Sequence, residues 1–506
     1  MKWIFGLILP ALFCSSNAFA QLVSTTNHGD PLSSHAVRTQ SRFIFEHQHL
    51  TPSAPLLDSA MSKVHGGALS LCTGPILDVA GGVQTGSSVR GLADGNAGAS
   101  ILLAGMRPVR AEISYQYIAS ALPSHMLEQS VPYDVLWNVG NAKRNGDVFL
   151  SHNVVGQVGV RCGKYVALDA GRQAHHIGDG YRSLILGRQA APLPFFRATA
   201  QVHKVRFFAE WMRAAHPFPT AQKQDDRHKF MAMHGLSMNL GKRFNWSVYE
   251  MVVWQERDTL NRRGLELHYL NPIVFYRPLE YAQGSADNVI LASTMRYKAS
   301  PKVGLYAQIV LDEFKLSQLR RELKWWANKY GAQLGVKWHN VIPELHMLWE
   351  GNVVRPFTYT HGSPVQSWTH WSQPLAHPLG ANFAEVLWRS VYQRGHWKYR
   401  AQLLYSAYGR DRDMNQDGFA DNLGGDLNRS YKNPFQQYGN ALLQGDKTNV
   451  FYQQLEVARA IGAEKAFEIY VQQHYRHASS QLGSNEQFWL LVGFRAAGML
   501  SALRDI

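Results

Sequence analysis

Hydrophobic and polar residues alternate along most of this chain. In HWKYRAQLLYSAY, residues 396–408, apolar side chains take every second position from Trp397 to Tyr405, and mostly charged or polar ones lie between. The same period of two runs through residues 303–312, 465–475 and 487–497. A period of two is typical of a β-strand with one apolar and one polar face. The chain is therefore predicted to be built from half-buried strands.

Similar segments recur from about residue 68 to residue 499, and many are ~9–12 residues long, the length of a tilted strand that crosses a bilayer. Aromatic residues make up 12% of the chain and often lie near strand ends, as Phe244, Trp246 and Trp254 do. This is typical of the aromatic girdles at membrane interfaces. The fold is therefore predicted to be all-β, a transmembrane antiparallel β-barrel of about 16–18 strands with some helical plug or loop segments.

A large secreted β-sandwich or propeller also alternates and is the competing fold. Two features favour the membrane barrel. The polar face of many strands carries Lys and Arg, which suit a wet lumen, and the connections between strands are very unequal in length.

The N-terminus predicts export. Lys2, an apolar run from Trp3 to Phe13 and the Ala18-Phe19-Ala20 triplet form a secretory signal peptide, residues 1–20. Cys14 raises a lipoprotein alternative, against which the bulky Phe13 argues. No later apolar run reaches the ~18 residues of a membrane helix. We expect residues 21–66 to form a plug or periplasmic segment, and residues 67–506 to form the barrel in the outer membrane of a Gram-negative bacterium.

Several polar connections carry a family resemblance. They are GRQAHHIGDGYRSLILG (171–187), LELHYLNPIVFYRPLEYAQGSADN (265–288), LDEFKL with KWWANKYGAQLG (311–316, 324–335), and the stretch from NVVRPFTYTH to HWSQPLAHPLGANFAEVL (352–387). In this order they resemble the capsule-assembly Wzi family, and most closely its branch similar to the gliding-motility protein RemB of Bacteroidetes-type bacteria. The resemblance covers most of residues 81–431.

The resemblance implies an outer-membrane barrel partly plugged by helices, which holds or organises capsular polysaccharide or serves surface motility. It implies no enzyme and no catalytic residue. The implied partners are outer-membrane lipid, an acidic or neutral surface polysaccharide, and capsule-export or motility proteins. The net charge of +14 suits an acidic glycan or lipopolysaccharide phosphates, and export argues against nucleic acid.

Polar residues within these motifs are the candidate ligand-binding groups, through ring stacking and hydrogen bonds to sugar hydroxyls or uronic acids. They are Arg172, His176, Asp179, Tyr181, Arg182, Asn271, Arg277, Glu280, Asp287, Asn288, Arg355, His370, Gln373, His377, Asn382 and Glu385, and further candidates for the lumen are Glu250, Asp312, Asn328 and Glu350. The alternative role for each is a hydrogen-bonded network that fills the lumen and pins the plug, and for any single residue this structural role is favoured.

Glu250 breaks the alternation. In FNWSVYEMVVWQ, residues 244–255, it shares parity with Trp246, Val248 and Val252. A carboxylate facing lipid is costly, so we expect a β-bulge that turns Glu250 inward.

The stretch DRDMNQDGFADN, residues 411–422, looks like a calcium loop. The ligands would be Asp413, Asn415, Asp417, the Phe419 carbonyl and Asp421. Position twelve of an EF-hand-type loop is Gly424 here instead of a carboxylate, so the alternative is a solvated loop built on Asx turns. In either case the loop would stabilise the structure locally and would not be the functional site.

Other chemistry is poorly supported. The histidines at 175, 176, 361, 370 and 377 have no HExxH or CxxC spacing for zinc, and neither GxSxG nor a phosphate loop occurs. Cys72 and Cys162 either form one bridge or stay as two strand residues. Two functions compete with polysaccharide binding. One is a diffusion channel or transporter, and the other is a barrel hydrolase that uses His370, His377 and Glu385.

Overall fold

The computed structural model describes residues 70–86, 89–104, 109–218, 227–257, 263–271, 276, 287–313, 325–462, 467–496 and 505. The expected signal peptide, the segment 21–66 and the candidate residues Arg277 and Glu280 lie outside this part. Among the described residues, no helix is long and apolar enough to span a membrane.

Eighteen antiparallel strands form a closed barrel within the described residues, which confirms the fold class and the strand number expected from the sequence. The first nine are β1 (Ser70–Thr85), β2 (Arg90–Ala104), β3 (Val109–Ala121), β7 (Val148–Cys162), β8 (Val166–Gln173), β9 (Leu193–Val202), β10 (Val205–His216), β11 (Arg227–Leu240) and β12 (Phe244–Gln255). The others are β13 (Asn288–Lys298), β14 (Val303–Leu311), β15 (Tyr330–Trp338), β16 (Leu345–Val354), β19 (Phe383–Arg394), β20 (Trp397–Arg410), β21 (Asp446–Ile461), β22 (Phe467–Ser480) and β23 (Gly483–Ala496).

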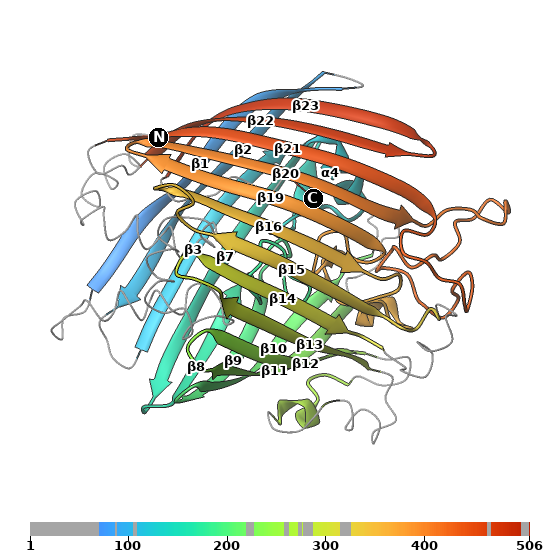
Figure 1. Ribbon diagram of the computed structural model, residues 1–506, viewed down its shortest axis with the longest axis horizontal. Helices are drawn as coiled ribbons and strands as arrows, with labels where there is room; N and C mark the ends of the chain where they lie inside the picture. The colour runs from blue at the N-terminus through green and yellow to red at the C-terminus, as the bar shows by residue number, and fades with distance from the viewer. Residues whose placement is uncertain are drawn as a thin grey trace.

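Each strand pairs with its neighbours in the sequence, and β1 closes the ring on β23 from Asp78↔Arg495 to Thr85↔Phe488 (Figure 1). The shorter elements lie in the connections. They are α4 (Ser124–Ser130), η2 (Val131–Tyr133), β4 (Val135–Leu136), β5 (Gly140–Asn141), β6 (Lys143–Asn145), η4 (Leu267–Leu270), η5 (Pro364–Gln366), β17 (Thr369–His370) and β18 (Gln373–Pro374).

The two faces of the wall follow the alternation of the sequence. In β23, Leu490 and Val492 are exposed on the outside, whereas Arg495 is fully buried inside and pairs with Glu456 (2.6 Å) and Glu468 (2.9 Å). The outside is therefore apolar and the inside is polar, as a barrel that stands in a membrane requires. Cys162, at the end of β7, is exposed and carries a free thiol.

The two ends of the barrel differ. One end, here called the short-turn end, carries the tight connections 105–108, 163–165, 203–204, 241–243, 299–302, 339–344, 395–396 and 462–466. The opposite end, the long-loop end, carries 122–147, 174–192, 217–226, 256–287, 312–329, 355–382 and 411–445, together with the short 86–89 and 481–482. In outer-membrane barrels the short turns face the periplasm and the long loops face the exterior.

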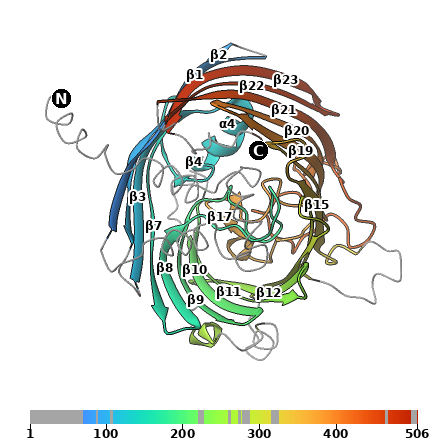
Figure 2. The same cartoon turned by 60° about the vertical axis from the view of Figure 1, so that its left-hand side comes forward.

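Several long connections lie inside the ring of strands. Figure 2 shows α4, β4 and β17 there. The largest buried apolar cluster joins residues 177–195 and 354–383 to inward side chains of strands β9 to β14. Since the lumen is packed by these segments, the barrel has a core of its own.

Glu250 stays on the outward face, so the expected bulge is wrong. Strand β12 pairs without interruption on both sides, with His234↔Glu250 on β11 and Glu250↔Leu291 on β13. The carboxylate is instead covered by the connection between β12 and β13. Its Oε2 accepts a hydrogen bond from the Tyr276 backbone N–H at 2.8 Å and lies 3.2 Å from His234 Nε2.

This cover, residues 263–271 and 276, packs on the outside of β10 to β13. Trp254 and Tyr269 are fully buried there, and their rings lie 4.9 Å apart. The indole N–H groups of Trp211 and Trp254 donate to the Tyr269 and Gly264 carbonyls at 2.8 and 3.0 Å. Trp254 therefore sits beneath protein instead of in the expected girdle. The yellow-green helical piece beside β11 and β12 in Figure 1 marks the position.

An arginine on the outer wall tests the membrane setting. Leu334, at the centre of β15, is 67% exposed and faces outward. We expect Leu334→Arg to lower the free energy of unfolding in phospholipid vesicles by ~2–4 kcal/mol, because a charge there enters hydrocarbon. Urea titration followed by tryptophan fluorescence measures this. Leu482→Arg, in the exposed 481–482 turn, is the control and should change little; equal effects would contradict the lipid-facing assignment.

Candidate functional site

The centre of the barrel is occupied by the connection between β8 and β9, residues 174–192, here called the plug. Its residues 177–186 fold back on themselves, because the Ile177 N–H donates to the Leu186 carbonyl (2.9 Å) and the Ser183 hydroxyl donates to the Ile177 carbonyl (2.6 Å). Gly178 has a φ of +113°, and a Cβ there would collide with the Gln308 side chain. A larger residue there would strain the backbone and displace the Gln308 amide that bonds the plug.

Glu350 of β16 anchors the plug to the wall. Its carboxylate accepts hydrogen bonds from the backbone N–H groups of Tyr181 (2.8 Å) and Arg182 (3.0 Å). The Tyr306 hydroxyl (2.7 Å) and the Asn352 amide (3.1 Å) donate to the same carboxylate. A buried carboxylate needs this number of donors to offset its lost hydration.

Arg182 is the charged centre of the plug. Its guanidinium lies 3.3 Å from Glu385 Oε1 and 3.2 Å from Asp505 Oδ2. The Glu385 carboxylate also lies 2.9 Å from His377 Nε2, and the Asp505 carboxylate accepts from the Tyr181 hydroxyl at 2.8 Å. These groups are buried and mutually neutralised, which is the arrangement of a structural network.

A second segment, 355–382, packs beside the plug. The Tyr359 hydroxyl and the Trp368 indole donate to the Leu184 and Ile185 carbonyls, both at 2.7 Å. Lys229 of β11 donates to the Ser367 carbonyl at 2.6 Å. The two interior segments are therefore bonded to each other and to the wall.

The structure brings only some of the predicted site residues together. Tyr181, Arg182, His377 and Glu385 form the central network, with Asp179 at its edge, 3.0 Å from Arg296. The remaining described residues are apart from it and bond to nearby backbone or side chains, among them His176, Arg172, Asp287, Asn288, Arg355, Asn382 and His370. Asn271 is exposed on the outer cover. The lumen candidates Asp312 and Asn328 are buried beside the 355–382 segment and the β14–β15 connection.

A sugar would have to displace these bonds at most of the predicted positions. Gln373 differs, because both its amide nitrogen and its amide oxygen are buried without a hydrogen-bond partner among the described residues. The assignment of these residues to ligand binding stays a prediction. Among the described ones, His370 Nε2 and Arg355 Nε are also buried without a hydrogen-bond partner.

The carboxylates of the acidic loop accept hydrogen bonds from the backbone of the same loop. Asp413 accepts from the N–H groups of Asp417 (3.1 Å) and Gly418 (2.8 Å), and Asp421 accepts from those of Met414 and Asn415. No group of three or more His, Cys, Asp or Glu side chains placed to hold a metal occurs within the described ranges. Calcium at this loop stays a prediction.

An aromatic cluster at the long-loop end was not among the predicted site residues. The Trp326 ring lies 5.6 Å from Phe357 and 5.0 Å from Tyr431, and the Lys329 ammonium lies 4.2 Å above the Tyr431 ring. The Trp326 indole donates to Gln437 at 2.8 Å, which brings residues 435–438 alongside. The adjacent tryptophans in KWWANKY are the feature of the sequence that could have indicated this cluster.

Burial lowers the pKa of the histidines in the 355–382 segment. Burial lowers the pKa of His370 to about 3, and Lys229 and Arg172 act in the same direction. Burial likewise lowers the pKa of His361 to about 4, and Lys329 adds to this effect. Burial also lowers the pKa of His377, although the Glu385 carboxylate opposes that change.

Comparison with known proteins supports the β-barrel fold. No family model matches the chain, and no curated protein is similar to it in sequence. Among solved structures the chain is similar to Wzi of Escherichia coli, an outer-membrane protein involved in group 1 capsule assembly and described as a carbohydrate-binding β-barrel. The TM-score is 0.51 at 11% identity, over 96% of this chain and 98% of that one.

It is also similar to two Pseudomonas aeruginosa proteins. One is the outer-membrane protein OprD, with a TM-score of 0.43 at 11% identity over 87% of this chain and 98% of that one. The other is OccK8, with a TM-score of 0.42 at 9% identity over 84% and 96%. The fold is that of an outer-membrane β-barrel. The resemblance to the Wzi family, and to its gliding-motility branch, stays a prediction beyond that fold.

Removal of the plug anchor should destabilise the barrel. We expect Glu350→Ala to lower the free energy of unfolding by ~3–5 kcal/mol, because it leaves the buried donors of Tyr306 and of the plug backbone unpaired. Urea unfolding in detergent micelles measures the change. Glu486→Ala removes an exposed carboxylate that pairs with His477 at 3.2 Å, and should change stability by less than ~0.5 kcal/mol. A similarly small effect of Glu350→Ala would show that the plug is not anchored there.

Acid should also destabilise the barrel, partly through His370. An unfolded imidazole titrates near pH ~6.5, whereas the folded one has its pKa lowered to about 3. Between these values the unfolded chain binds more protons, so stability falls as the pH drops below ~6.5, by of order 1 kcal/mol per pH unit for one such group. Unfolding measured from pH 7 to pH 4 should fall less steeply in His370→Asn. His203→Asn, in the 203–204 turn, should follow the unmodified chain; equal slopes in all three proteins would exclude the role of His370.

Proposed function

We propose that this protein is a non-enzymatic outer-membrane barrel that binds surface polysaccharide at its long-loop end, in capsule assembly or surface motility. The observation that carries the proposal is a group of aromatic residues at the long-loop end, here called the aromatic platform. Trp325, Trp326 and Tyr431 are in ring contact, and Phe435 and Tyr438 lie on the segment that Trp326 bonds through Gln437. Tyr438 is 46% exposed, Phe435 is also exposed, and the two tryptophans and Tyr431 are half-buried.

The platform has the chemistry of a glycan-binding surface. Aromatic rings offer flat apolar faces with little conformational entropy to lose, and pyranose rings present C–H faces that stack on them. Lys432 is exposed next to Tyr431, so the surface also suits carboxylates on an acidic glycan. Similarity of fold to a carbohydrate-binding barrel supports the same function.

The interior favours binding over transport. In a diffusion channel the central lumen is open to water. Here the plug is buried along its length and tied to the wall through Glu350 and Gln308, with the Gln308 amide oxygen accepting from the Leu184 N–H at 2.8 Å. The His370, His377 and Glu385 group of the hydrolase alternative is divided, since Glu385 pairs with His377 and Arg182 while His370 bonds to the Ala215 backbone.

The outer-membrane setting brings the expected partners within reach. The apolar outer wall lies against lipid, and the long loops at the exterior face meet glycans that extend from the cell. Capsule-export or motility proteins then act on a polysaccharide that the barrel holds. We assign no cofactor to this function, and the Asp413–Asp421 loop would contribute calcium only as a local staple.

Binding of the producer's own polysaccharide is the direct test. Surface polysaccharide purified from the producing bacterium is titrated into the purified barrel, and the dissociation constant is measured by calorimetry. We expect Trp325→Ala and Tyr438→Ala each to weaken binding by ~5–30-fold, equivalent to ~1–2 kcal/mol of lost ring contact.

Trp338→Ala is the matched control, because Trp338 is 42% exposed at the short-turn end, on the opposite side of the membrane. It should bind as the unmodified chain does. The proposal fails if the polysaccharide does not bind, or if the barrel conducts ions in planar bilayers as an open pore does.

A further inference from the structure

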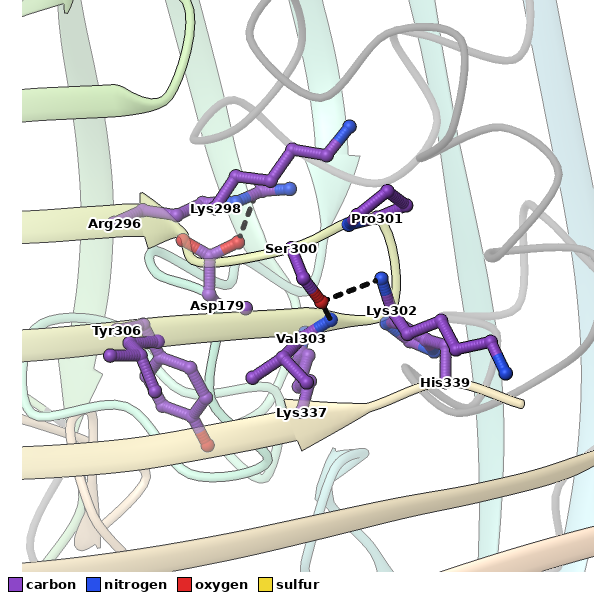
Figure 3. A pocket seen from close by; sticks show the side chains of 12 residues that line it. Asp179, Arg296, Lys298, Ser300, Pro301, Lys302, Val303, Tyr306, Lys337 and His339 are labelled. Atoms are coloured by element: carbon purple, nitrogen blue, oxygen red, sulfur yellow. Dashed lines mark hydrogen bonds and ion pairs between the residues drawn. The ribbon is translucent and has the colours of Figure 1, made fainter. Parts of the chain in front are cut away.

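A small pocket opens inside the barrel at the short-turn end. It is lined by the end of β13, the 299–302 turn, the start of β14 and the end of β15, and Asp179 of the plug closes it toward the centre (Figure 3). Its volume is about 40 Å³. This is room for about three water molecules, the size of one carboxylate or phosphate group and too small for a sugar ring.

The lining is strongly cationic. Arg296, Lys298, Lys302 and Lys337 contribute positive charge, and Asp179 is the one carboxylate among the lining residues. Arg296 neutralises Asp179 through an ion pair of 3.0 Å, drawn as a dashed line in Figure 3. Lys302 donates to the Asn340 carbonyl at 2.9 Å. After these pairings the pocket retains an excess of cations.

Lys337 is the group that most strongly indicates an anion-binding site. It occupies an inward position of β15 and is only 7% exposed, yet its ammonium has no hydrogen bond or ion pair with any described residue. Its Nζ lies 5.7 Å from the centroid of the Tyr306 ring. Burying an ammonium without a hydrogen-bonded anion is unfavourable by several kcal/mol, so the folded barrel gains stability when an anion binds.

Two further residues of the pocket lining could contribute to anion binding. Lys298, half-buried at the end of β13, also has no side-chain partner among the described residues. Nδ1 of His339 is buried without a hydrogen-bond partner. Lys298, Lys337 and His339 come from the ends of two strands and line the same pocket. Charge-assisted hydrogen bonds of ~2.7–2.9 Å from ammonium groups to an oxyanion are the strong kind.

We propose that this pocket binds a single oxyanion group, the carboxylate of a uronic acid or the phosphate of a sugar phosphate, at the short-turn end of the barrel. The pocket lies at the opposite end from the aromatic platform, and the inference does not depend on the platform. Arg296 pairs with Asp179, Lys337 binds the oxygens, and Lys298 adds positive charge to the lining. Ser300 shapes the turn by accepting from the Lys302 and Val303 N–H groups at 3.2 and 3.0 Å.

Small anions as probes test the site on the full-length chain in detergent at constant ionic strength. Inorganic phosphate, glucuronate and uncharged glucose are titrated separately, and the dissociation constant and the unfolding temperature are recorded. We expect at least one of the two anions to bind and to raise the unfolding temperature, whereas glucose does neither. Phosphate alone would identify a phosphorylated ligand, and glucuronate alone would identify a uronic acid.

Three substitutions locate the binding. We expect Lys337→Gln to weaken anion binding by about tenfold or more. Lys298→Gln, at a less buried position, should weaken it in the same direction, and it keeps the test valid if Lys337→Gln does not fold. Lys242→Gln is the control, because Lys242 is exposed in the 241–243 turn at the same end.

The proposal is overturned if neither anion binds, or if binding is unchanged in both pocket variants. It is also overturned if Lys242→Gln weakens binding as much as Lys298→Gln does, because the effect would then be diffuse surface charge. Polysaccharide binding at the long-loop end should be the same in Lys298→Gln as in the unmodified chain, so failure of this site and failure of the proposed function are distinguishable.

Discussion

A chain that crosses a membrane as strands must pair its backbone N–H and C=O groups within the sheet, because hydrocarbon supplies no hydrogen-bonding partner. The pairing of β1 with β23 meets this requirement by removing both edges of the sheet. Closure then fixes the rest of the architecture. It separates an apolar outside from a polar inside along every strand, and it encloses a lumen wide enough to need filling. It also gathers short turns at one end and long loops at the other.

The filling of that lumen is the second constraint. A wall of polar inward side chains around an interior segment is stable only when nearly all buried donors and acceptors are paired. Glu350 and Gln308 meet this need by bonding plug backbone directly, and Arg182 meets it by sharing its charge between Glu385 and Asp505. The groups that we propose to bind ligands lie at the two ends of the barrel. The long-loop end presents aromatic rings, and the short-turn end presents unneutralised cations.

The sequence predicts the wall well because the period of two is a local property. The alternation around Leu490 and Val492 is enough to assign the outward face of β23. It fails at Glu250, because the group that covers this carboxylate arrives from residue 276, a contact that no local pattern contains. The acidic loop shows a similar limit, since the spacing from Asp413 suits both calcium binding and hydrogen bonds to the backbone of the loop. Of the pocket that we propose to bind an oxyanion, only Asp179 was predicted, because the cations lie on separate strands that come together only when those strands pair.

The account depends most on a plug that is an integral part of the folded barrel. Hydrogen–deuterium exchange of residues 177–186 in the purified protein tests this claim directly, because amide protection reports the free energy of local opening. If the plug is bonded as described, its amides exchange as slowly as those of β15 and β16, which form the wall beside it. Exchange as fast as in the exposed loop around residues 413–419 would contradict the account, because the lumen would then be open to water.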